Sequence, residues 1–257
     1  MRKDQDGHEI WVIIGQSNTA CGDGFDPVLD APDPRVDQFV GRGPLFGQVI
    51  PAAEPLLHPI DMGVRIGFGL TFGKLRAQTL PEHQRVLLVP CAKGGTGFRP
   101  WGGYTWDRHD LDAPFNFFRF TIMQTEAALA AGPNNRIGGF LWHQGEHDTT
   151  PEAHPLYADR LDDLIGGLRA RFGADLPFIL GQLNPDHMQR VAADQPGYAA
   201  VDRIHAETPA RVARTAFVTG PAGSYNSEAD TIHYNAAGQR ELGRRYFAAA
   251  RELLDPA

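Results

Sequence analysis

Residues 10–18 read IWVIIGQSN, an apolar run that stops at Gly15 and is followed by Gln16, Ser17 and Asn18. A continuous apolar run, without polar alternation, predicts a strand that is buried on both faces, as in the parallel sheet of an α/β protein. A serine directly after such a strand can cap the next helix, or it can act as a nucleophile at the edge of the sheet. Position alone leaves both roles open.

Four further apolar runs resemble the first, and segments with helical periodicity separate them. The predicted strands are 10–15, 85–92, 137–144, 177–183 and 215–220, and the predicted helices are about 115–131, 156–172, 197–213 and 236–254. The helix over 156–172 has the clearest apolar face, and Asn235 is a natural N-cap for the last helix. Repeated alternation of strand and helix predicts parallel pairing through right-handed crossovers. We therefore expect a three-layer α/β/α fold with a flavodoxin-like parallel sheet of about five strands.

Length and composition suggest one domain over residues 1–257, with a long loop insertion at about 18–66 that is rich in Gly, Pro and Asp. The net charge of −7 argues against a nucleic-acid or anionic membrane surface as a partner. The N-terminal MRKDQDGHEI lacks the apolar core of a secretory signal, so a cytoplasmic location is expected. Cys21 and Cys91 are expected to be free thiols, because one pair of cysteines makes no disulfide scaffold.

Polar turns containing glycine follow the first three predicted strands. They are GQSN at 15–18, AKGGT at 92–96 and HQGE at 143–146. Ligands of open parallel sheets bind beyond the carboxyl ends of the strands, so these turns are expected to converge on one site. Gly94 and Gly95 would let a substrate oxygen approach backbone N–H groups, and Gln144 could add a side-chain amide.

Near the C-terminus, Asp230 and His233 are separated by three positions, in a segment expected to be a turn or the start of a helix. This spacing lets the carboxylate hold Nδ1 of the imidazole while Nε2 points outward as a general base. An isolated D-x-x-H is more often a loop aspartate beside an exposed histidine. Combined with Ser17, the pair supplies the nucleophile, base and orienting group that acyl transfer needs.

Two alternatives remain at this point. His143, Glu146 and His147 spell H-x-x-E-H, a zinc-hydrolase motif, but Gly145 interrupts it and a strand leads into it. The other alternative is a non-catalytic carbohydrate-binding protein that keeps the same fold. Chelators would inactivate the first, and a covalent adduct on Ser17 would exclude the second.

The order of the motifs is more specific than any one of them. It resembles the SGNH-hydrolase superfamily, and within it the sialate O-acetylesterase-like group that includes carbohydrate esterase family six. The resemblance extends from about Ile10 to Tyr246 and includes DPRV at 33–36 and PCAKGGT at 90–96. It implies a serine esterase that removes O-acetyl groups from sugars and uses no metal or organic cofactor.

Position by position, the resemblance implies that Ser17 is the nucleophile and that Asp230 and His233 complete the triad. It assigns the oxyanion hole to the backbone N–H groups of Ser17 and Gly95 and to the side chain of Gln144, with Gly94 as the alternative backbone donor. Supporting or substrate-binding roles are expected for Gln16, Asn18, Gly94, Glu146 and Trp101. The aromatic side chains of Phe98, Trp101, Tyr104 and Trp106 could stack on a sugar or pack the loop, and Lys93 or Arg99 could meet an acidic sugar.

Overall fold

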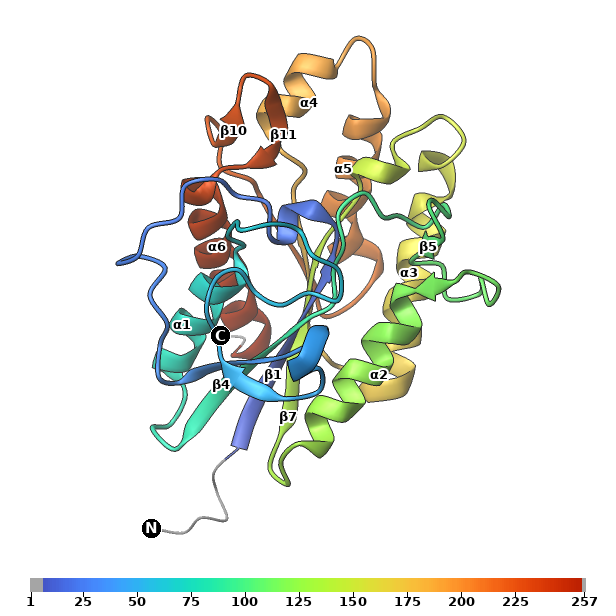
Figure 1. Cartoon of the computed structure of the whole chain (residues 1–257). Coiled ribbons are helices and arrows are strands. Elements are labelled where there is room, and N and C mark those ends of the chain that lie inside the picture. Colours follow the sequence, from blue (N-terminus) through green and yellow to red (C-terminus); the bar gives the residue numbers. More distant parts are fainter. Residues whose placement is uncertain (1–6, 256–257) are drawn as a thin grey trace.

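The computed structural model describes residues 7–255 and shows a twisted central sheet between two layers of helices (Figure 1). Residues 1–6, which make up most of the segment in which no secretory signal is expected, lie outside the described part of the chain. The seven-stranded sheet has the order β3-β2-β4-β1-β7-β8-β9, and only β3 runs antiparallel to its neighbour. The strands are β1 (Gly7–Gly15), β2 (Val36–Phe39), β3 (Val49–Pro51), β4 (Gln84–Pro90), β7 (Arg136–His143), β8 (Phe178–Gly181) and β9 (Thr215–Val218).

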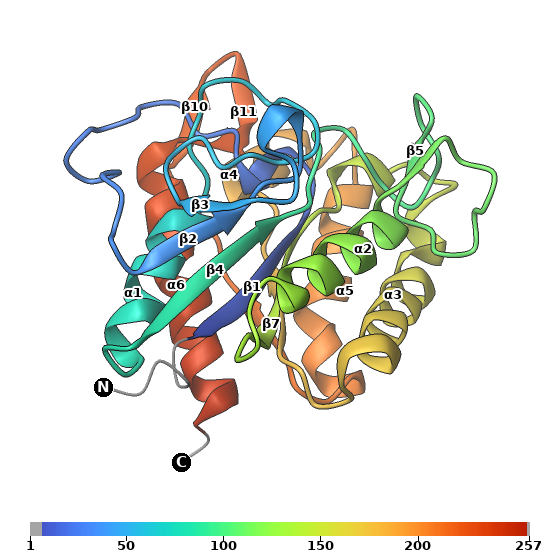
Figure 2. The same ribbon diagram turned by 60° about the horizontal axis from the view of Figure 1, so that its bottom comes forward.

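Helices cover both faces of the sheet (Figure 2). One face carries α1 (Gly69–Thr79) and α6 (Ala236–Leu254), and the other carries α2 (Phe117–Ala130), α3 (Tyr157–Phe172) and α5 (Gly197–Arg211). The short helix α4 (Pro185–Val191) follows β8. Successive residues of β1 pack alternately against the two helical layers. Ile10 and Val12 pack toward the α2 side, and Trp11 and Ile13 pack toward the α1 side. This central strand is therefore buried on both faces, which explains its unbroken apolar sequence.

The predicted fold class is confirmed. All five predicted strands are present, and their order in the sheet, β4-β1-β7-β8-β9, is the flavodoxin-like order. The four predicted helices correspond to α2, α3, α5 and α6, and the Asn235 side chain caps α6 by accepting a hydrogen bond from the N–H of Gly238. Helices α1 and α4 were not predicted.

The segment 18–66 differs from the expected loop because it contributes β2 and β3, which raises the strand count from about five to seven. Strand β2 reads VDQF, so it lacks the apolar signal of the other strands although all four residues are buried. Its Asp37 carboxylate is paired with Arg85 at 2.6 and 2.7 Å and with His8 at 2.9 Å. Partners from other strands thus allow a charged residue inside the sheet.

Short elements surround the carboxyl ends of the strands. They are the 3-10 turns η2 (Ser17–Thr19), η3 (Gly43–Leu45), η4 (Glu146–Asp148) and η5 (His154–Leu156), the pair β5 (Tyr104–Thr105) and β6 (Phe115–Asn116), and the hairpin of β10 (Tyr225–Ser227) and β11 (Asp230–Tyr234). Within residues 7–255, no helix combines the length and apolarity that crossing a bilayer requires. Cys21 and Cys91 are free and buried.

Candidate active site

A cavity of about 430 Å³ opens where the first three predicted strands end. It is lined by residues from five separate segments, namely Gln16, Ser17, Cys21, Gly94, Gly95, Glu146, His147, Tyr198, Ile232 and His233. The polar turns after β1, β4 and β7 therefore meet, as their positions in the sheet predict. The β10–β11 hairpin brings His233 to the same space from the far end of the chain.

Ser17 stands at an abrupt end of β1. Gly15 has φ of +132°, and a Cβ there would lie 2.1 Å from the carbonyl oxygen of His143, so only glycine fits. The next N–H, that of Gln16, donates to this carbonyl at 2.8 Å, and η2 begins immediately afterwards at Ser17. Within residues 7–255 the N–H of Ser17 has no acceptor. The turn thus presents both a hydroxyl and a backbone donor at the cavity.

His233 is oriented by a carboxylate on its own strand. Nδ1 of His233 lies 2.8 Å from Oδ1 and 3.0 Å from Oδ2 of Asp230. Asn226, which the sequence motifs do not single out, donates from Nδ2 to Asp230 Oδ2 at 3.0 Å and to the carbonyl of Cys21 at 2.9 Å. Burial alone would raise the pKa of Asp230, but the hydrogen bonds from Asn226 and His233 and the charge of His233 hold it below its ordinary value. The carboxylate is therefore ionised at neutral pH.

The motif Asp230-x-x-His233 lies in a bulged hairpin, not in the expected turn or helix start. Tyr225 pairs with Tyr234 and Ser227 with Asp230, so one residue of β10 faces three of β11. In a regular strand, residues three apart point to opposite faces. The two surplus residues bend β11 at this point, and the bend allows the carboxylate to reach the imidazole.

Asn18 links this hairpin by hydrogen bonds to the segment that carries Ser17. Its Nδ2 donates to the carbonyl of Ile232 at 3.1 Å, and its Oδ1 accepts from the N–H of Tyr234 at 3.0 Å. The same Nδ2 donates to Oε1 of Glu146 at 2.6 Å. One amide therefore connects three of the segments that form the cavity.

Glu146 is a buried carboxyl group at the cavity wall. Burial raises its pKa, and the hydrogen bond from Asn18 and the charge of His233 only partly oppose this effect. Its second oxygen, Oε2, is buried without a hydrogen-bond partner in the described part of the chain. In the described part of the chain, the side chain of Glu146 contacts Asn18 and makes no hydrogen bond to Asp230 or His233.

The turn after β4 brings two glycines to the cavity. A Cβ on Gly94 would lie 3.5 Å from Cβ of Ser17, which shows how closely this backbone approaches the serine. Gly95 has φ of +68°, and a Cβ there would lie 3.4 Å from the ring of Trp101. Among residues 7–255, neither glycine N–H has a backbone or side-chain acceptor. Both remain available as donors to an oxygen beside Ser17.

Gln144 departs from its expected role. It is fully buried behind the cavity wall, and its Nε2 donates to Asp148 Oδ2 at 2.7 Å and to the carbonyl of Thr96 at 3.1 Å. Its Oε1 accepts from the hydroxyl of Tyr157 at 2.8 Å. The two amide hydrogens are thus used inside the protein, and the side chain is directed away from the cavity.

The H-x-x-E-H motif is not assembled as a metal site. The ring of His143 turns toward α6, where Nδ1 lies 3.2 Å from the hydroxyl of Tyr246, whereas His147 lies in η4 against the ring of Trp101. Within residues 7–255, no group of three or more His, Cys, Asp or Glu side chains could hold a metal ion. This arrangement gives the zinc interpretation no support.

Of the four candidate aromatic residues, Trp101 is the only one that is exposed. Phe98 and Trp106 are buried in the core, and the Tyr104 ring is covered by Nζ of Lys93 at 4.4 Å from its centroid. Trp101 is 56% exposed and neighbours Gly95 and His147, both of which line the cavity. It therefore forms a rim to which a sugar ring has access.

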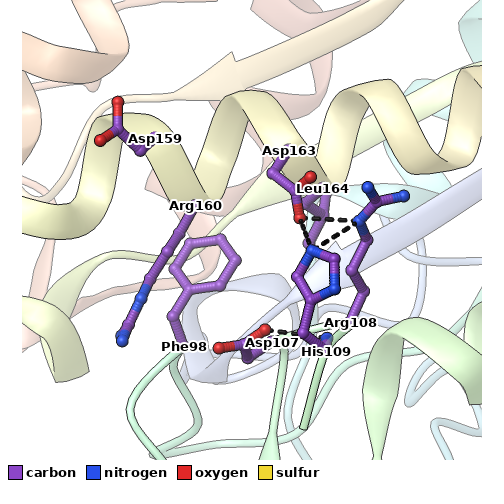
Figure 3. Close-up of a pocket in the computed structure, with 8 residues that line it drawn as sticks. All are labelled: Phe98, Asp107, Arg108, His109, Asp159, Arg160, Asp163 and Leu164. Atoms are coloured by element: carbon purple, nitrogen blue, oxygen red, sulfur yellow. Dashed lines mark hydrogen bonds and ion pairs between the residues drawn. The ribbon is translucent and has the colours of Figure 1, made fainter.

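A second cavity, of about 200 Å³, lies between α3 and the loop that precedes β6 (Figure 3). Its charges largely satisfy one another, because Asp163 accepts from Arg108 Nε at 2.7 Å and lies 2.9 Å from His109 Nε2. None of the predicted catalytic residues lines it. The candidate site is therefore the cavity at Ser17.

Comparison with known proteins identifies one family. A family model described as carbohydrate esterase, sialic acid-specific acetylesterase, matches residues 7–252. The chain is 26% identical over 215 residues to a probable 9-O-acetyl-N-acetylneuraminic acid deacetylase of Escherichia coli K12, covering 70% of this chain and 64% of that protein. It is 28% identical over 255 residues to a probable carbohydrate esterase of Arabidopsis thaliana, covering 92% and 87%. The crystal structure of NanS superposes over the full length of both chains with a TM-score of 0.82 at 18% identity.

Proposed function

The chain belongs to the carbohydrate esterase family of sialic acid-specific acetylesterases, and on this premise we propose that it hydrolyses O-acetyl esters of carbohydrates. One observation supports the proposal most strongly. Ser17 and His233, which are 216 positions apart in the chain, line the same cavity, and His233 is held by the carboxylate of Asp230. A serine nucleophile and its general base require a common site of this kind, with a carboxylate that orients the imidazole.

In the proposed reaction, Oγ of Ser17 attacks the acetyl carbonyl carbon and Nε2 of His233 takes its proton. The bond to the sugar oxygen then breaks, and His233 returns the proton to this oxygen as the alcohol leaves. Water, deprotonated by the same imidazole, releases acetate from the acetyl-serine. Asp230 keeps Nδ1 protonated and stabilises the imidazolium in both steps.

The oxyanion that forms during each attack needs donors beside Ser17. The N–H groups of Ser17 and Gly95 are proposed for this role, with Gly94 as the alternative, because all three residues line the cavity and lack internal acceptors in the described chain. Donors that are already in place lower the barrier without reorganisation during the reaction.

The proposed substrates are acetylated sugars, with O-acetylated sialic acids as one class. Supporting this choice are the family description and the name of the bacterial relative. Trp101 offers an exposed ring at the cavity rim, and Lys93 places its ammonium 5.9 Å from the centroid of this ring. A sugar stacked on Trp101 would thus have a cation nearby that could meet a carboxylate.

The decisive experiment compares Ser17→Ala with Ser224→Ala. Within residues 7–255 the hydroxyl of Ser224 hydrogen-bonds only to the carbonyl of Ala222, and Ser224 does not line the cavity. We expect Ser17→Ala to abolish acetate release from p-nitrophenyl acetate and from acetylated sugars, and the control to remain active. A fluorophosphonate should label Ser17, as seen by mass spectrometry, and chelators should have no effect. Near-wild-type turnover by Ser17→Ala would refute the proposal, and an unlabelled protein without turnover would favour the non-catalytic binding protein.

A further inference from the structure

Tyr198 is the one buried tyrosine whose hydroxyl has no hydrogen-bond partner among residues 7–255. It is 6% exposed and lines the catalytic cavity. The other three buried tyrosines donate to groups inside the protein, namely Tyr157 to Gln144 Oε1 at 2.8 Å, Tyr234 to the carbonyl of Gln182 at 3.1 Å and Tyr246 to the carbonyl of Trp142 at 2.6 Å. The hydroxyl of a buried tyrosine normally has a partner, so a ligand in the cavity is the natural partner for Tyr198.

The hydroxyl of Tyr198 is open to the cavity and carries its proton. Oε2 of Glu146 and Nε2 of His147, on residues that line the same cavity, are enclosed without a partner in the described part of the chain, whereas the Tyr198 oxygen is not enclosed in this way. Burial and the neighbouring Glu146 carboxyl raise the pKa of Tyr198 to about 12. At neutral pH the hydroxyl is therefore able both to donate and to accept a hydrogen bond.

The ring of Tyr198 is held beside the hairpin that carries the proposed base. The ring of His187 meets it edge to face, with the ring centroids 4.8 Å apart. Nδ1 of His187 in turn lies 2.9 Å from Oγ1 of Thr231, the residue that follows Asp230. The hydroxyl is thus placed before a ligand arrives, which reduces the entropy lost on binding.

The order of the strands places Tyr198 on the opposite side of Ser17 from the proposed oxyanion donors of the β4 turn. In the sequence β4-β1-β7-β8, Gly94 and Gly95 follow β4, Ser17 follows β1, and Tyr198 lies in the connection that follows β8. An acetyl carbonyl whose oxygen is directed at Gly95 therefore leaves the rest of the ester on the side of Tyr198. Because His233 returns its proton to the sugar oxygen, the sugar leaves beside the hairpin, where Tyr198 lies.

We propose that the hydroxyl of Tyr198 hydrogen-bonds a free hydroxyl group of the sugar from which the acetyl group is removed. The inference rests on the proposed esterase function and narrows its substrates to esters of alcohols that carry further hydroxyl groups. A simple alkyl or aryl acetate gives Tyr198 no such partner. Tyr198 takes no part in making or breaking bonds, so its contribution is to substrate selection.

Tyr198→Phe tests this role, because it removes the hydroxyl and keeps the ring. We expect kcat/KM for mono-O-acetylated hexoses to fall about 3- to 10-fold, as the loss of one neutral hydrogen bond implies. Cyclohexyl acetate has a ring of similar size without hydroxyl groups, so its kcat/KM should not change, nor should that of p-nitrophenyl acetate. Tyr225→Phe is the matched control, because the hydroxyl of Tyr225 bonds to Glu228 and Tyr225 does not line the cavity. It should leave all these rates unchanged.

Two results with folded Tyr198→Phe would overturn the inference. One is an unchanged kcat/KM for every acetylated hexose, and the other is an equal loss with cyclohexyl acetate, which would assign the hydroxyl to the ester or to the fold.

If thermal denaturation shows that Tyr198→Phe does not fold, monodeoxy analogues of the best acetylated hexose replace it. One of them should react with the wild type about 3- to 10-fold more slowly, and equal rates for all would overturn the inference. Hydrolysis of p-nitrophenyl acetate without acetate release from any sugar would instead refute the proposed carbohydrate function, which the other outcomes leave intact.

Discussion

The side chain of Asn18 holds the backbone on both sides of His233. It donates to the carbonyl of Ile232 and accepts from the N–H of Tyr234, at 3.1 and 3.0 Å. Because Asn18 directly follows Ser17, its amide joins the segment of the proposed nucleophile to the strand of the proposed base. The bond from Asn18 to Glu146 fixes the orientation of its amide in turn.

We therefore predict that Asn18→Ala slows turnover more than it weakens substrate binding. Loss of the amide leaves the backbone groups of Ile232 and Tyr234 without partners, which costs about 1–3 kcal/mol of stability. Displacement of His233 by as little as about 1 Å would lower kcat on the order of a hundredfold. Urea denaturation and steady-state kinetics measure both effects. Wild-type kcat in a folded Asn18→Ala variant would show that other contacts position His233.

The two glycines after β4 should respond differently to substitution by alanine. Gly95→Ala places a side chain at φ of +68° and 3.4 Å from Trp101. We therefore expect the free energy of unfolding to fall by about 1 kcal/mol and kcat to fall at least tenfold. Gly94→Ala introduces an ordinary 3.5 Å contact with Ser17 and should affect stability little. Denaturation midpoints and kcat for both variants test this difference. A greater loss of kcat in Gly94→Ala would favour Gly94 as the backbone donor.

Trp101 should matter for sugars and not for small esters. If its exposed ring stacks on the substrate, Trp101→Ala should raise KM for acetylated saccharides about three- to tenfold, as the loss of about 1 kcal/mol of ring contact implies. KM for p-nitrophenyl acetate should not change. Leu111→Ala is a suitable control, because Leu111 is also a large apolar side chain, is 69% exposed and does not line the cavity. Equal KM values for wild type and Trp101→Ala on every sugar would remove Trp101 from the binding surface.

Glu54 should make stability depend on pH. Burial raises its pKa to about 8, from 4.5, and its Oε1 is buried without a partner within residues 7–255. Between these two pH values the folded protein binds a proton that the unfolded chain releases, so the free energy of unfolding falls as pH rises. The contribution is fully present below about pH 4.5 and is lost as pH rises through about 8.

Glu54→Gln removes this titration and retains an oxygen for the N–H of Leu56. We predict that its advantage in stability over wild type grows with pH, by at most about 1.4 kcal/mol per unit, and levels off above about pH 9. Urea denaturation of both proteins at pH 5 to 9 measures the difference, in which other titrating groups cancel. A constant difference across this range would mean that Glu54 ionises normally.

The sequence predicts the fold well where burial leaves a simple pattern. Strand β1 lies between two helical layers, so every position from Ile10 to Ile14 is apolar and the strand is evident. Strand β2 is equally buried, but Asp37 is hydrogen-bonded to Arg85 and His8, which come from other strands. No local pattern contains those partners, and β2 therefore could not be predicted.

The candidate site shows the same limit. Three of the polar turns could be placed together, because parallel strands end at a common edge of the sheet. The direction in which each side chain points could not be predicted from the sequence. Whether Gln16 or Gln144 faces the cavity depends on Asp148, Tyr157 and the N–H of His147, and these contacts exist only in the folded chain.

The uneven pairing of β10 and β11 also suggests how a related protein could lose its catalytic activity. Hairpins at a protein surface usually tolerate changes in length. Excision of two residues between Asp230 and Tyr234 would give an even ladder and a sound hairpin, yet the imidazole would lose its carboxylate. A descendant shortened in this way would keep most of the cavity wall. It would bind acetylated sugars without hydrolysing them.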